Sequence, residues 1–168
     1  MFITLLTAPN EIMPHSLYMF MDMVDNKVWD NSVFMHKWEH MVQAEAIQAG
    51  SGNPRDLSEY NLAFPEYSSE FNHEKYTVGF SGRPSETKFY INLVENGNKH
   101  GPGKQEHSTI LNDVDPCFAK VVHGEDALVQ LSNLNNEAVS THDTLFSVIR
   151  SAKRMFPSKE LLDHLANK

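Results

Sequence analysis

Two short apolar runs separated by a long, glycine-rich stretch constrain the fold of this chain more than any other feature. In the first run, Phe89 to Val94, apolar residues alternate with Tyr90 and Asn92. A period of two is typical of a β-strand with one buried face. The second run, Phe118 to Val122, ends at His123-Gly124. We therefore expect two strands, and the face of the first strand that presents Tyr90 is one on which a ligand could sit.

Two helices are expected around these strands. Glu125 and Asp126 follow the second run, and acidic residues suit the first turn of a helix. Pro14 suits a helix start, and the apolar residues after it recur at three- and four-residue spacing. These apolar residues are Leu17, Phe20, Met21, Val24 and Val28. The methionines in or next to this segment are Met13, Met19, Met21 and Met23. We interpret them as gap-filling core residues; the alternative is a pliable binding surface.

Turn-forming residues mark the loops. Gly50 to Pro54 and Gly97 to Gly103 are rich in glycine, asparagine and proline, and both predict loops. Thr144 to Met155 predicts a closing strand. Pro157-Ser158 predicts the start of a short C-terminal helix. This helix would carry Leu161, Leu162 and Leu165.

Composition limits the classes of protein that remain. A chain of 168 residues with 40% hydrophobic content can bury one sizeable core and is short for two domains. Its net charge of -8 offers no basic surface, so nucleic acid is not expected as a partner. The single Cys117 cannot form an internal disulfide, and we interpret it as a small core residue. No apolar run reaches the length of a membrane span, so we expect the chain as given to be soluble.

In their order, these elements resemble a cyclophilin, the family of peptidyl-prolyl isomerases whose eight-stranded barrel is capped by two helices. The most specific match is Phe89 to Leu93 paired with Phe118 to Gly124. A strand at Phe2 to Leu6, the helix after Pro14, and a strand with Phe34 and an amide at Gln43 agree with it. The resemblance spans roughly residues 2 to 155 and is that of a divergent member.

The resemblance implies a mainly β fold with a closed eight-stranded barrel and two capping helices. The short C-terminal helix predicted above extends past the family's usual end. We expect a barrel domain over residues 1–156 and a helical extension over residues 157–168. The family's barrel usually opens with one more strand than the chain shows before Phe2. We therefore expect that the first strand is missing and that the chain is a piece of a longer protein. A targeting or membrane segment could have been lost with it, so the compartment stays open.

The family's activity is rotation about Xaa-Pro peptide bonds. Amide resonance makes the barrier about 18–20 kcal/mol, and a catalyst must stabilise the twisted state. In cyclophilins a groove accepts the proline ring, a Gln helps to hold the peptide, and an Arg guanidinium points at the imide nitrogen. This is electrostatic preorganisation with no covalent step and no cofactor. The implied partner is a proline-containing peptide or protein segment.

The resemblance fails at the family's Arg. Counting forward from Phe34, that position falls on His36; counting back from Gln43, it falls on Met35. Lys37 is one step along, and on a strand that step turns the side chain to the opposite face. An imidazole is mostly uncharged at neutral pH and is shorter than Arg. The loss of one charge-assisted hydrogen bond, about 1.5 to 3 kcal/mol, would slow catalysis roughly 10- to 150-fold.

Other groove positions are mixed. The resemblance carries the family's Met and Gln onto Met41 and Gln43, its pocket Phe onto Tyr90, and a pocket Leu onto Leu111. It places Ser81 near the peptide-holding position. Ile110 lies where many members have Trp, and Asp115 where many have His. The alternative for Met41, Tyr90 and Leu111 is ordinary packing in the barrel. For His36 and Gln43 we favour a position in the peptide-binding groove.

A rival motif overlaps this site. His36 to His40 has the H-x-x-E-H spacing of the inverted zinc-protease signature, which requires both histidines on one helix face. Ser32 to Phe34 favours a strand instead, and a five-letter match arises easily in a chain with 9 histidines. We therefore expect no metal, and we interpret the remaining histidines, including His73 and His100, as solvated side chains.

Two hypotheses follow. The first is a prolyl isomerase, weak because the Arg is absent, that acts on exposed Xaa-Pro segments. The second is a peptide-binding or scaffold module that keeps the fold and has lost catalysis. Binding without turnover would separate them.

Overall fold

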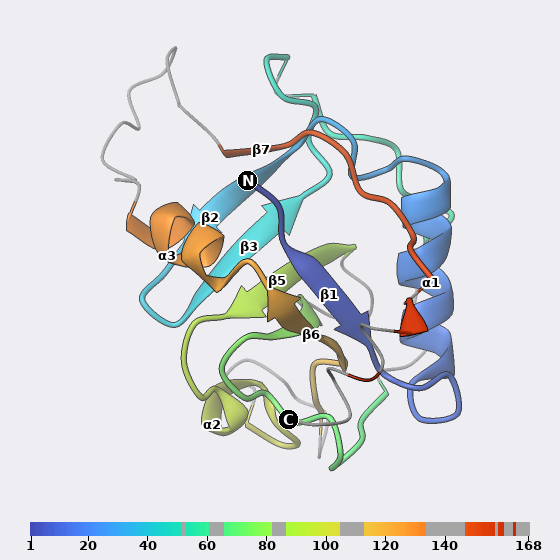
Figure 1. Cartoon of the computed structure of the whole chain (residues 1–168), viewed down its shortest axis with the longest axis vertical. Helices are drawn as coiled ribbons and strands as arrows, with labels where there is room; N and C mark the ends of the chain where they lie inside the picture. The colour runs from blue at the N-terminus through green and yellow to red at the C-terminus, as the bar shows by residue number, and fades with distance from the viewer. Residues whose placement is uncertain are drawn as a thin grey trace.

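A single antiparallel sheet of seven strands, curled into a half-barrel, dominates the computed structural model (Figure 1). The structure describes residues 1–51, 53–60, 66–81, 87–104, 113–133 and 147–156, together with residues 158, 159 and 163. The strands are β1 (Thr4–Thr7), β2 (Ser32–Lys37), β3 (Met41–Glu45), β4 (Thr77–Ser81), β5 (Lys88–Asn92), β6 (Cys117–His123) and β7 (Ser147–Ile149). Their order across the sheet is β1-β6-β4-β5-β3-β2-β7. The mainly β prediction is confirmed, and the apolar runs around Tyr90 and Phe118 form β5 and β6.

Closure of the barrel is not seen among the described strands. β1 and β7 stand at opposite ends of the strand order, and each pairs with one neighbour only in the described part of the chain. The closed eight-stranded barrel therefore stays a prediction. The described sheet is one strand short of that number and open.

Three helices are defined within the described ranges. They are α1 (Pro14–Asp25), α2 (Gly97–His100) and α3 (Glu125–Asn133). α1 and α3 are the two predicted helices. In Figure 1 they lie to the right and to the left of the curled sheet, and both bury apolar residues in one core. α2 corrects the prediction of an uninterrupted loop over Gly97 to Gly103. Its four residues are too few to give a hydrophobic period, so the turn formers hid it.

The core lies between α1 and the sheet. The ring of Phe20 in α1 lies 4.8 Å from that of Phe118, 5.7 Å from that of Phe89 and 6.2 Å from that of Phe80, measured between centroids. Such aromatic contacts combine large buried areas with favourable edge-to-face geometry. Met13, Met19 and Met23 are buried in the same core, which confirms them as packing residues. Cys117 is also buried, as predicted, and burial raises the pKa of its thiol to about 12.

A carboxylate from a distant segment caps α1. Pro14 occupies the first helical position, where its missing N–H costs nothing. The next two backbone N–H groups, of His15 and Ser16, donate to the two carboxylate oxygens of Glu66 at 2.8 and 2.7 Å. A negative charge at this end also complements the helix dipole. The helix start is therefore fixed by a residue 50 positions along the chain.

Several element bounds differ from the sequence-based ones. β1 begins at Thr4, and Phe2 is exposed. β5 ends at Asn92, so the alternation stops before Val94, which is exposed. The closing strand is β7 alone, and residues 150–156 have no regular structure. Residues 144–146 and the predicted C-terminal leucines lie outside the described residues. No helix in the described ranges is long and apolar enough to cross a membrane.

Candidate functional site

The two faces of the sheet differ in kind. Val42 and Ala44 of β3 and Phe89 and Ile91 of β5 point into the core, where all four are buried. The residues that alternate with them point the other way, because successive side chains on a strand lie on opposite faces. We call this second side the outer face. It carries polar and charged side chains from β2 through β6.

An extra residue in β2 places His36 on the outer face. Phe34 pairs with Ala44, but His36, two residues on, pairs with Gln43, so Met35 is the inserted residue of a bulge. If β2 were a regular strand without this bulge, His36 would share the face of Phe34, two residues earlier, and point inward. The register therefore pairs His36, and not Met35, with Gln43 across the ladder.

Strand pairing extends this position into a row. Gln43 pairs with Tyr90, and Tyr90 pairs with Gly79. Residues directly opposite each other on paired strands lie on the same face. His36, Gln43, Tyr90 and Gly79 therefore cross four strands side by side. Three of the predicted site residues are neighbours in space.

Glu45 gathers the polar groups at one end of the row. Its Oε1 atom lies 2.9 Å from Nε2 of His36, 3.3 Å from Nε2 of Gln43 and 3.5 Å from Nζ of Lys88. An ionised carboxylate only accepts hydrogen bonds, so Nε2 of His36 carries the proton that points at Glu45. In the neutral imidazole the other nitrogen, Nδ1, is then an acceptor. No sequence pattern pointed to this role of Glu45.

Lys37 is directed away from the row. It pairs with Val42, a core residue, and so lies on the face opposite His36, as predicted. Burial lowers the pKa of Lys37. The H-x-x-E-H motif is not helical: His36 lies in β2, and His40 lies in the turn before β3. Within the described ranges, no three His, Cys, Asp or Glu side chains are grouped so that they could hold a metal ion.

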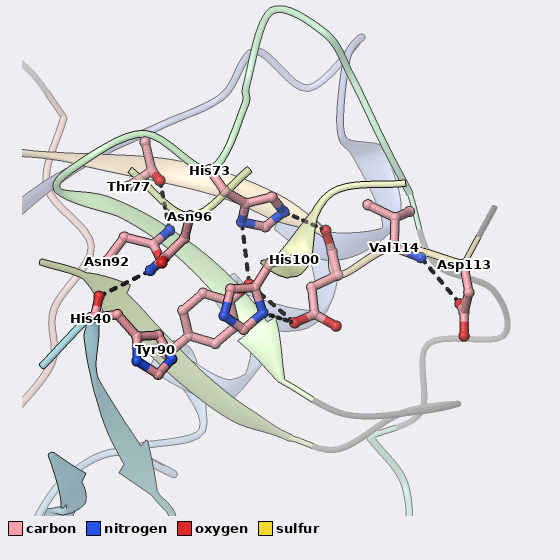
Figure 2. A network of polar contacts seen from close by, with 10 residues as sticks. His40, His73, Thr77, Tyr90, Asn92, Asn96, His100, Asp113 and Val114 are labelled. Atoms are coloured by element: carbon pink, nitrogen blue, oxygen red, sulfur yellow. Dashed lines mark hydrogen bonds and ion pairs between the residues drawn. The ribbon is translucent and has the colours of Figure 1, made fainter. Parts of the chain in front are cut away.

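Tyr90 belongs to a buried polar network with Asp115 and two histidines. Figure 2 labels Tyr90 and the histidines, His73 and His100. Its hydroxyl lies 3.1 Å from Oδ2 of Asp115 and 3.2 Å from Nδ1 of His73. The same Oδ2 atom accepts a hydrogen bond from Nδ1 of His100 at 2.8 Å. Nε2 of His73 donates to the backbone carbonyl of Asp115 at 3.0 Å. Asp115 therefore joins β5, α2 and the segment that carries His73.

Burial keeps His73 neutral. Desolvation, followed by the nearby His100, lowers the pKa of His73 to about 4, although Asp115 opposes the shift. Because Nε2 holds the proton of the neutral ring, Nδ1 is an acceptor toward Tyr90. Tyr90 has one hydroxyl proton, so it is shared between His73 and the carboxylate of Asp115.

A series of rings joins the row to the network. The ring of Trp38 lies 5.1 Å from that of His36 and 6.2 Å from that of His40. The ring of His40 lies 6.0 Å from that of His100, which lies 4.7 Å from that of Tyr90. Burial, Lys99 and His100 lower the pKa of His40. The rings form one connected surface that runs from solvent at Trp38 to the interior.

The remaining predicted site residues in the described ranges lie on β3, on β4 and just before β6. Met41 is buried in β3 on the same side as Gln43, two positions away. Ser81 ends β4 opposite Lys88, which reaches Glu45. Asp115 is buried and touches Tyr90, so the structure brings these two together. Ile110 and Leu111 lie outside the described residues.

Besides Glu45, sequence reasoning missed His73 and His100. Both were interpreted as solvated, but His73 is fully buried and His100 packs on Tyr90. Their partners are 15 to 42 residues away, so no local spacing could reveal them. The one available signal was Asp115, a carboxylate directly before an apolar strand, which must find donors if it is buried.

Together, the fold and the site define a half-barrel β protein whose candidate site lies on the outside of its sheet. The family model described as "Cyclophilin type peptidyl-prolyl cis-trans isomerase/CLD" matches residues 8–153. The chain therefore belongs to the cyclophilin-type peptidyl-prolyl cis-trans isomerase family, which confirms the resemblance seen in the sequence.

Two solved structures of a Cryptosporidium parvum cyclophilin-type peptidyl-prolyl cis-trans isomerase are similar to this chain. The one determined in the presence of the dipeptide Ala-Pro has a TM-score of 0.64, 13% sequence identity and coverage of 89% of both chains. The other has a TM-score of 0.65 and 13% identity, and it covers 89% of this chain and 88% of that chain. At this identity the likeness establishes the shared fold alone. A search of curated proteins finds no match to the sequence.

Proposed function

We propose that this protein binds Xaa-Pro segments of other proteins on the outer face of its sheet and isomerises them weakly. The observation that carries the proposal is the row in which His36, Gln43 and Tyr90 lie side by side on β2, β3 and β5. These are the positions onto which the family's Arg, its Gln and its pocket Phe were carried. Membership of the family supports the peptide ligand.

Weak activity follows from what His36 can offer. Stabilising the twisted imide calls for a cation or a strong donor aimed at its nitrogen. The proton on Nε2 of His36 is directed at Glu45, 2.9 Å away, so the neutral ring has no second N–H to give. A second donor appears only when the imidazole is protonated. The expected rate is therefore lower by about 10- to 150-fold than with a guanidinium at this position.

A non-catalytic peptide-binding or scaffold module is the alternative. Complete burial of Tyr90 favours it, because a pocket floor has to meet the proline ring. Its hydroxyl is also committed to Asp115 and His73. In this alternative the outer face serves recognition without rotation of the bound peptide bond.

Two structural proposals accompany the functional one. We infer that the half-barrel is the described part of a closed eight-stranded barrel over residues 1–156. We also infer that residues 157–168 form a separate helical extension. Proteolysis that removes the extension and leaves a cooperatively folding barrel would support the boundary, and loss of cooperative folding would contradict it.

The decisive experiment is NMR exchange spectroscopy on a short Xaa-Pro peptide, with and without the protein. It compares the parent with His36→Ala and Gln43→Ala, and with Gln130→Ala as a control at an exposed position of α3. We expect weak acceleration of cis/trans exchange that both site variants lose and the control keeps. Peptide shifts without acceleration would select the binding module. Neither shifts nor acceleration would overturn the proposal.

A further inference from the structure

His100 covers the residue that should form the floor of the proline pocket. The side chain of Tyr90 is 0% exposed, and the ring of His100 lies 4.7 Å from it between centroids (Figure 2). The ring of His73 lies 6.2 Å from that of Tyr90 and 5.7 Å from that of His100, so the three rings adjoin one another. A proline ring cannot contact Tyr90 while His100 occupies this place.

Hydrogen bonds tie His100 to the floor that it covers. Oδ2 of Asp115 accepts from Nδ1 of His100 at 2.8 Å and from the hydroxyl of Tyr90 at 3.1 Å. The backbone N–H of Asp115 also donates to the carbonyl of His100 at 3.2 Å. The carboxylate is buried, and charge-assisted hydrogen bonds of this kind are the stronger ones. One oxygen atom, Oδ2 of Asp115, therefore holds both His100 and Tyr90.

The backbone around His100 is suited to movement as a unit. His100 ends α2, a single turn that begins at Gly97 and is followed by Gly101. Glycines at both ends allow backbone rotations that other residues resist. Just before α2, the side-chain amide of Asn96 donates to Asn92 at 2.6 Å and to the carbonyl of His40 at 2.9 Å. The chain is thus anchored at Asn96 before α2. After α2, the backbone N–H of Gly103 donates to the carbonyl of Asp113 at 2.7 Å, so α2 is the short segment between two anchors.

We propose that His100 is a gating residue that decides whether a proline ring reaches Tyr90. In the closed state described here, the bond to Asp115 holds α2 over the pocket floor. When that bond breaks, α2 swings away and exposes the Tyr90 ring next to Gln43. This inference rests on the proposed function for its ligand, but the exposure of Tyr90 tests the gate by itself.

Tyrosine nitration with tetranitromethane measures that exposure. The nitration rate of each tyrosine is followed by peptide mass spectrometry in the parent and in His100→Ala. Asp115→Asn is a second variant that keeps the volume and weakens the shared acceptor. His123→Ala, an exposed histidine at the end of β6, is the matched control. Tyr18, which is 76% exposed, is the internal reference in every sample.

Peptide binding is measured on the same proteins by NMR titration with a short Ala-Pro peptide. We expect His100→Ala to nitrate Tyr90 at least tenfold faster than the parent and to bind the peptide about tenfold to 100-fold more tightly, as expected for the loss of one charge-assisted hydrogen bond. Asp115→Asn should act in the same direction, and His123→Ala should match the parent.

The two proposals fail in different ways. Nitration of Tyr90 that stays as slow in both variants as in the parent would overturn the gate, whatever happens to peptide binding. Fast nitration without any peptide binding would support the gate and overturn proline recognition at Tyr90. If His100→Ala does not fold, Asp115→Asn decides the question, since it removes charge without leaving a cavity.

Discussion

A Cβ atom on Gly79 would lie 2.8 Å from the hydroxyl of Tyr90, its neighbour across the β4–β5 ladder. The carbonyl oxygen of Pro116 would be almost as close, at 2.9 Å, and it already accepts the backbone N–H of Phe80. The absence of a side chain at residue 79 is therefore what lets the Tyr90 ring lie flat in the row.

Gly79→Ala should destabilise the protein by about 1 to 3 kcal/mol, because one of the two close atoms is backbone and cannot move aside. Urea denaturation measures the change. Gly97→Ala is the control, since its nearest neighbour is the flexible end of Glu95 at 3.3 Å. We expect it to stay within about 0.5 kcal/mol of the parent. Equal effects of the two substitutions would contradict the packing described for Tyr90.

Restoring a guanidinium at the Arg position should raise isomerase activity. His36→Arg is expected to increase kcat/KM roughly 10- to 150-fold over the parent, from one charge-assisted hydrogen bond in the transition state. Lys37→Arg, one residue along on the opposite face, should have no such effect. A protease-free NMR exchange assay compares the three proteins.

Substitution of Glu45 gives a second test of the effect of an arginine at residue 36. An arginine at residue 36 would also pair with Glu45, so His36→Arg combined with Glu45→Gln should be at least as active as the single variant. If neither protein gains activity over the parent while Xaa-Pro peptides still bind, the missing Arg is not what limits the rate.

Acid should weaken the fold through His73. Its pKa is lowered to about 4 in the folded state, against 6.5 for the ordinary side chain. The unfolded chain therefore takes up a proton at this site as the pH falls through 6.5, whereas the folded chain does so only near pH 4. Stability is lost across that window by about 3 kcal/mol at most. The lowered pKa reflects desolvation first, and then repulsion by His100.

Urea denaturation at pH 7 and at pH 4.5 gives the measurement, and His73→Gln isolates the contribution. We expect the pH dependence of the variant to be shallower than that of the parent over this window. Parallel curves for the two proteins would mean that His73 is solvated or paired in another way.

Cys117 should be inert in the folded protein. Its pKa is raised to about 12 by burial, and only the thiolate is nucleophilic. Iodoacetamide at pH 8 should label it at least 1000-fold more slowly than a free thiol, from the shortage of thiolate alone. Labelling in urea should be fast. Rapid labelling under native conditions would show that the β4–β6 region opens readily.

The parts of this structure that sequence patterns revealed are those with local periods. The alternation around Tyr90 predicted β5 and its two faces, and the spacing after Pro14 predicted α1. The bulge at Met35 left no such mark, because an inserted residue looks like any other until its partner strand is known. Sequence counting consequently offered both Met35 and His36 for one position.

The polar network was hidden for a different reason. Asp115 meets Tyr90, which is 25 residues away, and His73 meets the carbonyl of Asp115, which is 42 residues away. Contacts over such separations are set by the topology of the sheet, which the sequence does not encode as a repeat. Histidine is also mostly exposed or partly exposed in proteins, so burial of His73 was not the default expectation.

The carboxylate of Glu66 at the start of α1 has a consequence for the order in which the chain folds. A helix of 12 residues is marginal in isolation, and its first turn has the largest share of unsatisfied backbone donors. Here two of those donors, the backbone N–H groups of His15 and Ser16, bond to Glu66, which lies 51 and 50 residues further along the chain. Completion of the first turn of α1 is therefore expected late in folding, because it requires closure of the long loop between α1 and Glu66, which costs conformational entropy. Glu66→Gln should accelerate unfolding more than it slows folding, which stopped-flow measurements of both rates would reveal.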